Sequence, residues 1–148
     1  MPILLIGAAL AAAALAGSGC GGERARTPRP TPALPHFAQR FDPTLPCPRR
    51  PRTTAELEGC VERDIARTSA MIDAEARRVF ALLAPAGRRA FARGERAWLA
   101  YRKASCTAES SKYAGGSNEP VVFGYCVAKQ NRRHLADLAT LRRELTRR

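Results

Sequence analysis

"TTAELEGCVERDIARTSAMIDAEARRVFALL", residues 53–83, is the longest regular hydrophobic pattern in this chain. Its apolar and small residues recur at steps of three and four, which trace one face of a helix. Thr53 is in position to cap that helix, and Glu56 completes a capping-box pattern. Pro85 and Gly87 end the pattern, so the sequence predicts a helix over residues 54–84. The predicted inward face consists of Leu57, Val61, Ile65, Thr68, Ile72, Ala76, Val79 and Leu83.

Two further helices are predicted downstream. The second is predicted to run from Arg88 to Cys106. The third is predicted to follow Cys126 and to continue toward Arg148, with leucines at helical spacing. Between Cys106 and Cys126 the residues are typical of turns. No alternation of period two is long enough for a sheet, so we expect one all-α domain of about three helices over residues 53–148. The second helix is predicted to bury Ala90, Phe91, Ala97, Trp98 and Tyr101 and to expose Arg88, Arg89, Arg93, Arg96 and Arg102; the third is predicted to bury Val127, Leu135, Leu138, Leu141 and Leu145.

The amino-terminal stretch is predicted to be an export signal. From Ile3 to Gly19 no side chain is charged, and small residues crowd the end of this run. That length is short for a membrane span, so residues 1–19 are interpreted as a cleaved signal peptide. The following "LAGSGC" is similar to a bacterial lipoprotein signal, in which Cys20 is acylated and becomes the mature terminus. Ordinary cleavage, which leaves Cys20 as a free thiol, is the alternative.

Residues 20–52 are predicted to be an anchor followed by a tether. Repeated Pro and Arg and few large apolar residues are typical of an extended, unpacked segment. Arg24, Arg26 and Arg29 lie beside the predicted anchor, where they would be attracted to anionic lipid head groups. A solvated linker that happens to be basic is the other interpretation.

The chain has five cysteines. Acylation of Cys20 would leave Cys47, Cys60, Cys106 and Cys126, an even number for two disulfides in an exported protein. Four cysteines allow three connectivities, and the spacing alone does not choose among them. No CxxC redox spacing and no Cys and His cluster of a zinc site is present, so we expect no metal.

The segment "ERAWLAYRKASC", Glu95 to Cys106, is followed by "GGS" at residues 115–117, then by Cys126 and "RRHLADL". This order resembles the DUF1311 family, the domain of the lysozyme inhibitor LprI. The resemblance implies disulfides Cys47 with Cys60 and Cys106 with Cys126, an envelope location and, for the named member, lysozyme inhibition. It makes Trp98, Tyr101 and Arg102 structural signatures. "SAMIDAEA" in the first helix departs from the family pattern.

Charge bears on such an activity, because the chain carries a formal net charge of +12. Animal lysozymes are also basic, so contact with one requires a local acidic surface. One candidate is the start of the first helix, with Glu56, Glu58, Glu62 and Asp64. The other is the Cys106 to Cys126 loop, whose candidate partner contacts are Tyr113, Ser117, Asn118 and Glu119. Against these, acids in a first turn also favour the helix dipole, and Gly-rich loops are often only connections.

A rival hypothesis is a basic envelope protein that binds anionic cell-wall polymers or the membrane surface, because Arg greatly outnumbers Lys. Nucleic-acid binding suits the charge but not an exported, disulfide-bonded chain. The two histidines, His36 and His134, belong to no catalytic motif, and no cofactor motif is present. We therefore expect a non-enzyme without cofactors in the bacterial envelope.

Overall fold

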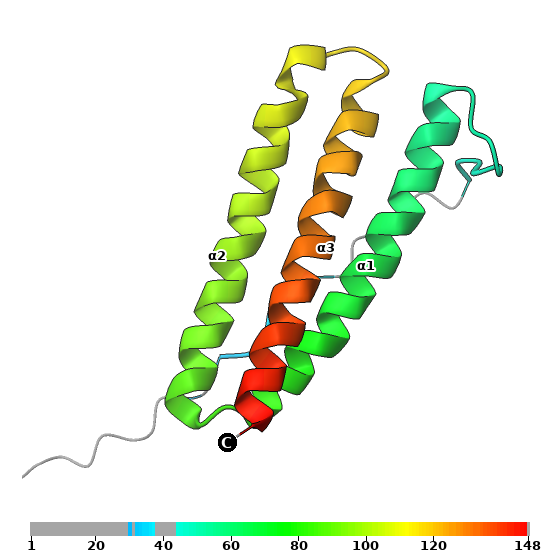
Figure 1. Ribbon diagram of the computed structural model, residues 1–148. Helices are drawn as coiled ribbons and strands as arrows, with labels where there is room; N and C mark the ends of the chain where they lie inside the picture. Colours follow the sequence, from blue (N-terminus) through cyan, green and yellow to red (C-terminus); the bar gives the residue numbers. More distant parts are fainter. Residues whose placement is uncertain (1–29, 31, 38–43, 148) are drawn as a thin grey trace, which may run out of the picture.

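The computed structural model describes residues 30, 32–37 and 44–147. This part of the chain is an antiparallel bundle of α1 (Thr54–Leu82), α2 (Pro85–Ser110) and α3 (Glu119–Thr146), with a short 3-10 helix, η1 (Ser111–Tyr113). No strand is present in these ranges. α3 lies between α1 and α2 and packs on both (Figure 1). The prediction of an all-α domain of about three helices is confirmed.

α1 follows its sequence pattern closely. Thr53 caps the helix: its Oγ1 accepts from the amide of Glu56 at 3.2 Å, and the Glu56 carboxylate accepts from the Thr53 amide at 3.1 Å. The amide of Arg52 also donates to that carboxylate, at 2.6 Å. These backbone hydrogen bonds, the one from Arg52 first, lower the pKa of Glu56. Six of the eight predicted inward residues are buried, and Leu57 and Leu83 at the two ends are half-buried.

α2 differs from the prediction in both ends and in its inward face, because it runs on past Cys106 to Ser110. It begins at Pro85, because Pro is well suited to the first turn of a helix. Tyr101, predicted inside, is 60% exposed, and Arg102, predicted outside, is only 4% exposed. Ala90 and Ala97 are exposed as well. The true inward face runs at steps of three and four through Ala92, Glu95, Leu99, Arg102 and Cys106. Because Glu95 and Arg102 are charged, a search for regularly spaced apolar residues does not find this face.

α3 begins earlier than predicted. Residues 119–126 were expected to be part of a turn, but they form the first two turns of α3, so only residues 111–118 connect α2 to α3. We call these residues the connecting loop. Gly124 lies within this early part of α3, against α1, where an added Cβ would lie 2.6 Å from Val61 Cγ1. A glycine that is usually a turn signal therefore serves here as a close-packing residue.

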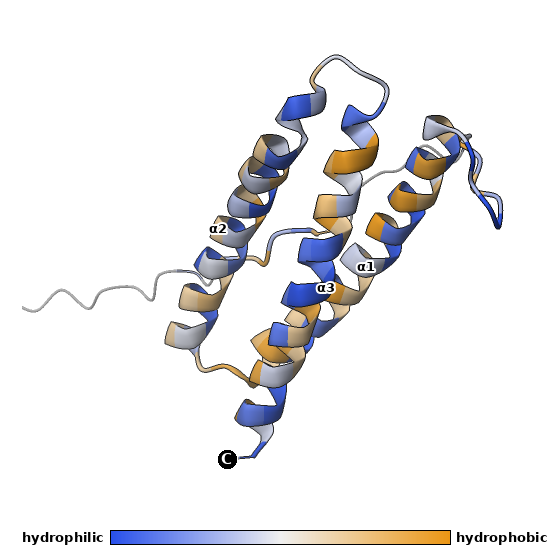
Figure 2. Cartoon of the chain, turned by 45° about the horizontal axis from the view of Figure 1, so that its top comes forward, coloured by the Kyte–Doolittle hydropathy of each residue, from blue (hydrophilic) through white to orange (hydrophobic). Residues whose placement is uncertain are grey.

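The interior has two apolar clusters. One contains Val61, Ile65 and Val127 around the Cys106–Cys126 disulfide, and the other contains Ile72, Val79 and Leu138. Hydrophobic positions (orange) alternate with hydrophilic ones (blue) along each helix in Figure 2. In register between the two clusters, each helix contributes polar side chains that are hydrogen-bonded to one another. We call this set the polar layer; it consists of Thr68, Ser69, Arg102 and Asn131.

The folded part starts before Thr53, in contrast to the predicted tether over residues 20–52. Residues 32–37, which we call the N-terminal strap, lie against the bundle. Phe37 is 1% exposed within the second apolar cluster, and its ring centroid lies 6.0 Å from that of Trp98. The amide of Phe37 donates to Asp73 on α1 at 3.0 Å, and Arg96 on α2 donates to the carbonyl of Ala33 at 3.0 Å. The strap thus bridges α1 and α2.

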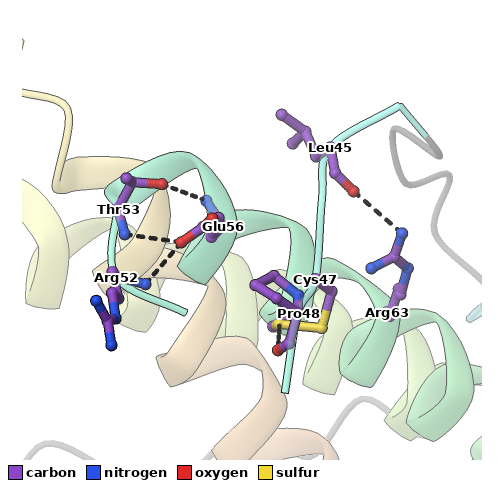
Figure 3. The surroundings of a disulfide bond; sticks show 8 residues. Leu45, Cys47, Pro48, Arg52, Thr53, Glu56 and Arg63 are labelled. Carbon is purple, nitrogen blue, oxygen red and sulfur yellow. Dashed lines mark hydrogen bonds between the residues drawn. A yellow bond between two sulfur atoms is a disulfide. The ribbon is translucent and has the colours of Figure 1, made fainter. Parts of the chain in front are cut away.

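Both disulfides have the pairing that the family resemblance implies. Cys47–Cys60 ties the segment before α1 to the first turns of that helix (Figure 3). Arg63 donates to the carbonyl of Leu45 at 3.1 Å beside it, and Gly59 allows the backbone to approach, because an added Cβ would meet the carbonyl oxygen of Pro46 at 2.3 Å. Cys106–Cys126 joins α2 to α3. Within the described ranges, no helix is long and apolar enough to cross a bilayer.

Candidate functional site

The connecting loop projects from the end of the bundle that also holds the start of α1 (Figure 1). Its backbone is ordered by hydrogen bonds within the loop, from Gly116 to Tyr113 at 2.9 Å and from Glu119 to Gly116 at 3.1 Å. Gly115 has a φ of 75°, the left-handed region that favours glycine. These features give the loop a defined backbone conformation.

Of the four predicted contact residues, Tyr113, Ser117 and Asn118 lie on this loop, and Glu119 is the first residue of α3 directly after it. Ser117 and Asn118 are exposed, and Tyr113 is half-buried, with the Lys112 ammonium 5.0 Å from its ring centroid. Glu119 differs from the expectation of a free acid, because its carboxylate accepts from the Gly115 amide at 2.8 Å. Its carboxylate therefore braces the loop.

A shallow cavity of about 420 Å³ lies at the base of the loop. Thr107, Ser110, Glu119, Pro120 and Phe123 line it, close in sequence to both cysteines of the Cys106–Cys126 disulfide. The nearby Glu109 carboxylate pairs with the Lys129 ammonium at 3.1 Å.

The second acidic candidate, at the start of α1, is largely committed to contacts within the chain. Glu56 holds the helix cap, and Asp64 pairs with Arg67 at 2.7 Å and also with Arg132. Arg49, Arg50 and Arg52 are exposed just before the helix. Glu56 and Asp64 therefore contribute little free negative charge, but Glu109 and Glu119 near the connecting loop are engaged as well, so charge alone does not choose between the two regions.

The family-signature residues have separate roles. Trp98 is half-buried and stacks on His134, with ring centroids 3.8 Å apart. His134 Nε2 also lies 2.8 Å from a Glu95 carboxylate oxygen. Tyr101 faces solvent. Arg102 donates to the Asn131 side-chain oxygen at 2.5 Å, and Asn131 donates to the hydroxyls of Thr68 and Ser69 at 2.9 and 3.1 Å.

This polar layer was missed by sequence reasoning. The only available signal was the spacing of three and four that places Arg102 in line with Ala92 and Cys106. In the described ranges, no group of three or more His, Cys, Asp or Glu residues is arranged to hold a metal ion. Cys20, the predicted lipidation site, and Arg24, Arg26 and Arg29 lie outside the described residues, as does the predicted signal peptide.

A family model described as lysozyme inhibitor LprI matches residues 47–138 of the chain. The matched range begins at Cys47 and contains both disulfides, the connecting loop and the signature residues Trp98, Tyr101 and Arg102. No curated protein and no solved structure gives a significant match. The N-terminal strap lies before the matched range, so its packing is a feature of this chain that the family model does not cover.

Proposed function

The chain belongs to the lysozyme inhibitor LprI family, and from this membership we propose that it is an exported envelope protein that blocks lysozyme. The inhibition would use a binding surface and no catalytic group. The observation that carries the proposal is the family match over residues 47–138, a range that holds the complete disulfide framework and the connecting loop.

We place the contact surface at Tyr113, Ser117 and Asn118, with Glu119 as the residue that orders the loop. A loop whose shape is already fixed loses little conformational entropy on binding, which favours affinity. The neighbouring Cys106–Cys126 disulfide holds the ends of α2 and α3 together on either side of the loop. This geometry supports an aromatic and two polar groups entering a sugar-binding cleft.

The proposed location is the bacterial envelope, with Cys20 acylated and residues 1–19 removed. The acyl chains would hold the protein at a membrane, and Arg24, Arg26 and Arg29 would add attraction to anionic head groups. The domain would then act where lysozyme attacks the wall. Support for this location comes from the lipoprotein-like "LAGSGC" segment and from the odd cysteine left over once both disulfides have formed.

The test is a turbidity assay with the purified protein and several lysozymes. We expect lysis of cell walls to slow in its presence. Replacing Tyr113 and Asn118 together by Ala should abolish inhibition, because both belong to the proposed contact surface. The fold should remain intact, because neither residue belongs to the two apolar clusters. Tyr101→Ala is the matched control, since this tyrosine is 60% exposed on α2, away from the loop, and its loss should leave inhibition unchanged.

The runner-up function is binding to anionic cell-wall polymers. The exposed arginines of α2, Arg93 and Arg96 among them, and the net charge of +12 favour it. The two functions respond differently to salt. Binding to a basic lysozyme should weaken little as salt rises, because screening also removes the repulsion between two cationic proteins, whereas polymer binding should fall steeply. Finding no inhibition of any lysozyme, together with salt-sensitive binding to wall material, would overturn the proposal in favour of polymer binding.

A further inference from the structure

A second cavity, of about 390 Å³, lies between the N-terminal strap and the bundle. Its volume is within the range of roughly 300–1,000 Å³ typical of small-molecule sites. Phe37, Leu99 and Phe123 provide apolar lining, and the Arg102 and Lys103 side chains provide positive charge. The cavity thus combines an apolar surface with two neighbouring cations.

Arg102 is the unusual member of this set. It is 4% exposed, yet its contacts in the described part of the chain are the neutral Asn131 side chain and the Trp98 ring, whose centroid lies 4.9 Å from the guanidinium carbon. Burial lowers the pKa of Arg102. Burying a cation without a negative partner is costly, because the charge loses its hydration.

The other buried ionisable side chains of the described residues are acids, and each of them has a basic side chain as its partner. Glu75 pairs with Arg78 and Arg142, Glu95 with His134, and Asp73 with His36. Asp73, which lies beside the cavity-lining residues His36 and Phe37, is already held by His36 and by the Phe37 amide. Among the described residues, Arg102 is therefore a buried cation without a carboxylate partner, beside a cavity of ligand size.

We propose that this cavity binds a small amphiphile whose carboxylate or phosphate head pairs with Arg102 and whose hydrocarbon part lies against Phe37 and Phe123. A guanidinium suits this role because its planar N–H groups match two oxygens of one head group. Lys103 at the rim adds a second positive charge. The site does not depend on lysozyme binding. Because Phe37 forms one wall, an occupied cavity also holds the strap in place.

The fluorescence of the single tryptophan in the chain can be used to detect binding in this cavity. Trp98 contacts Arg102 and Phe37, so a ligand at Arg102 should change its fluorescence. The purified protein is titrated with octanoate and with octyl phosphate, both below micelle-forming concentrations. We expect a saturable fluorescence change and a higher melting temperature with one head group or both, and the stronger response identifies the preferred head. Octyl glucoside, with the same chain and a neutral head, and acetate, with no chain, should give neither.

Variants separate the cavity from general charge. Arg102→Gln should weaken binding roughly tenfold or more. Lys103→Glu is the second variant, because this exposed residue can change without disturbing the core, and it should also weaken binding. Lys112→Glu is its matched control on the connecting loop, and it should bind as the unaltered protein does. Equal responses to octyl glucoside and octanoate, equal effects of the two lysine variants, or no saturable response would each overturn the proposal.

Discussion

Asn131 connects side chains from all three helices, although it is 0% exposed and carries no charge. Its oxygen accepts from Arg102 on α2, and its nitrogen donates to Thr68 and Ser69 on α1. A buried polar group with every partner satisfied contributes modestly to stability, but the same group left without partners is costly. The polar layer therefore fixes the register of the helices at one level of the bundle.

Asn131→Ala should destabilise the protein by about 3 kcal/mol, because it leaves the Arg102 guanidinium buried with its last side-chain acceptor removed. Urea unfolding followed by circular dichroism measures the change. Arg133→Ala, at an exposed position on the same helix, is the control and should shift stability by about 0.5 kcal/mol or less. Similar losses for the two variants would show that the polar layer is dispensable.

Two helix glycines should respond to alanine in opposite directions. At Gly124 a new Cβ would lie 2.6 Å from Val61 Cγ1, so Gly124→Ala should cost about 1–3 kcal/mol by forcing α1 and α3 apart. At Gly94 an added Cβ has nothing within 4 Å, so Gly94→Ala should stabilise α2 by about 0.5–1 kcal/mol. Thermal unfolding of both proteins checks the signs, and a stabilising Gly124→Ala would contradict the packing described here.

At this scale, sequence reasoning succeeded where burial follows hydrophobicity and failed where it does not. Ile65, Ile72 and Val79 were placed inside correctly, because each lies on a regular apolar face. For Tyr101 and Arg102 the predicted burial is the reverse of the observed burial. The reason is that a hydrophobic pattern places a tyrosine inside and an arginine outside. The burial of Arg102 depends on its neighbours Asn131 on α3 and Trp98 on α2, which no hydrophobic pattern reveals.

Among the elements, α1 and α3 are joined by the most extensive interface of the bundle. Asp64 and Glu75 on α1 both form ion pairs with arginines of α3, and Glu75 is the buried one of the two acids. Burial opposes ionisation of Glu75, but hydrogen bonds from Arg142 on α3 and from Arg78 outweigh that effect and hold its pKa below the ordinary value. A carboxyl group with a lowered folded-state pKa stabilises the fold above its unfolded pKa. That contribution is lost as the pH falls through the folded value.

We therefore expect the unaltered protein to lose stability as the pH falls below about 4.3, the ordinary pKa of a glutamate. Glu75→Gln should be less stable than the unaltered protein at pH 7 and should show a smaller decline in acid. Melting temperatures across the acid range measure both effects. Glu144→Gln, at an exposed position on α3, should follow the unaltered protein. An unchanged acid decline in Glu75→Gln would contradict the role of the Glu75–Arg142 pair.

The two disulfides should differ in their contribution. Cys106 and Cys126 are both 0% exposed within an apolar cluster, whereas Cys47 is exposed. Replacing Cys106 and Cys126 together by Ala should cost about 3 kcal/mol or more, because it removes both the cross-link and buried packing. Replacing Cys47 and Cys60 should cost less. Melting temperatures of the two double variants decide, and the reverse order would show that the segment before α1 matters more than the core.

The helix boundaries show what sequence can give at the level of elements. The start of α1 was predicted correctly because its capping box is local. The start of α3 was not, because Gly124 and Pro120 are typical of turns. In the structure Pro120 occupies the first turn of α3, and Gly124 is required by the approach of α1. The second reason exists only in the packed bundle.

At the scale of the whole molecule, the packing of the N-terminal strap limits how far the bundle of a membrane-anchored form could lie from the membrane. With Phe37 packed in the core, the segment between Cys20 and Pro32 spans at most roughly 40 Å when fully extended. The burial of Phe37 could not be predicted from the sequence, because an isolated Phe in a Pro-rich stretch gives no periodic pattern. Its partners, Asp73 and Trp98, belong to two separate helices.

Anchoring itself is tested by Cys20→Ala expressed in a bacterial host that processes lipoproteins. The unaltered protein should appear in the membrane fraction, and the variant should move to the soluble exported fraction because it has no acyl chain. Mass spectrometry of the mature terminus is the direct measurement. An unmodified Cys20, or cleavage upstream of it, would show that the protein is secreted without a lipid.

The placement of the two disulfides determines what a protease can release. Cys47–Cys60 closes a loop that ends within α1, and Cys106–Cys126 joins α2 to α3, so neither bond crosses the turn at Leu83 and Ala84. One cut in that turn would leave two fragments with no covalent bond between them. A cut in the connecting loop would instead leave fragments that stay joined through Cys106–Cys126 until a reductant is added. The connecting loop is therefore the place where the backbone can be broken while the molecule still remains in one piece.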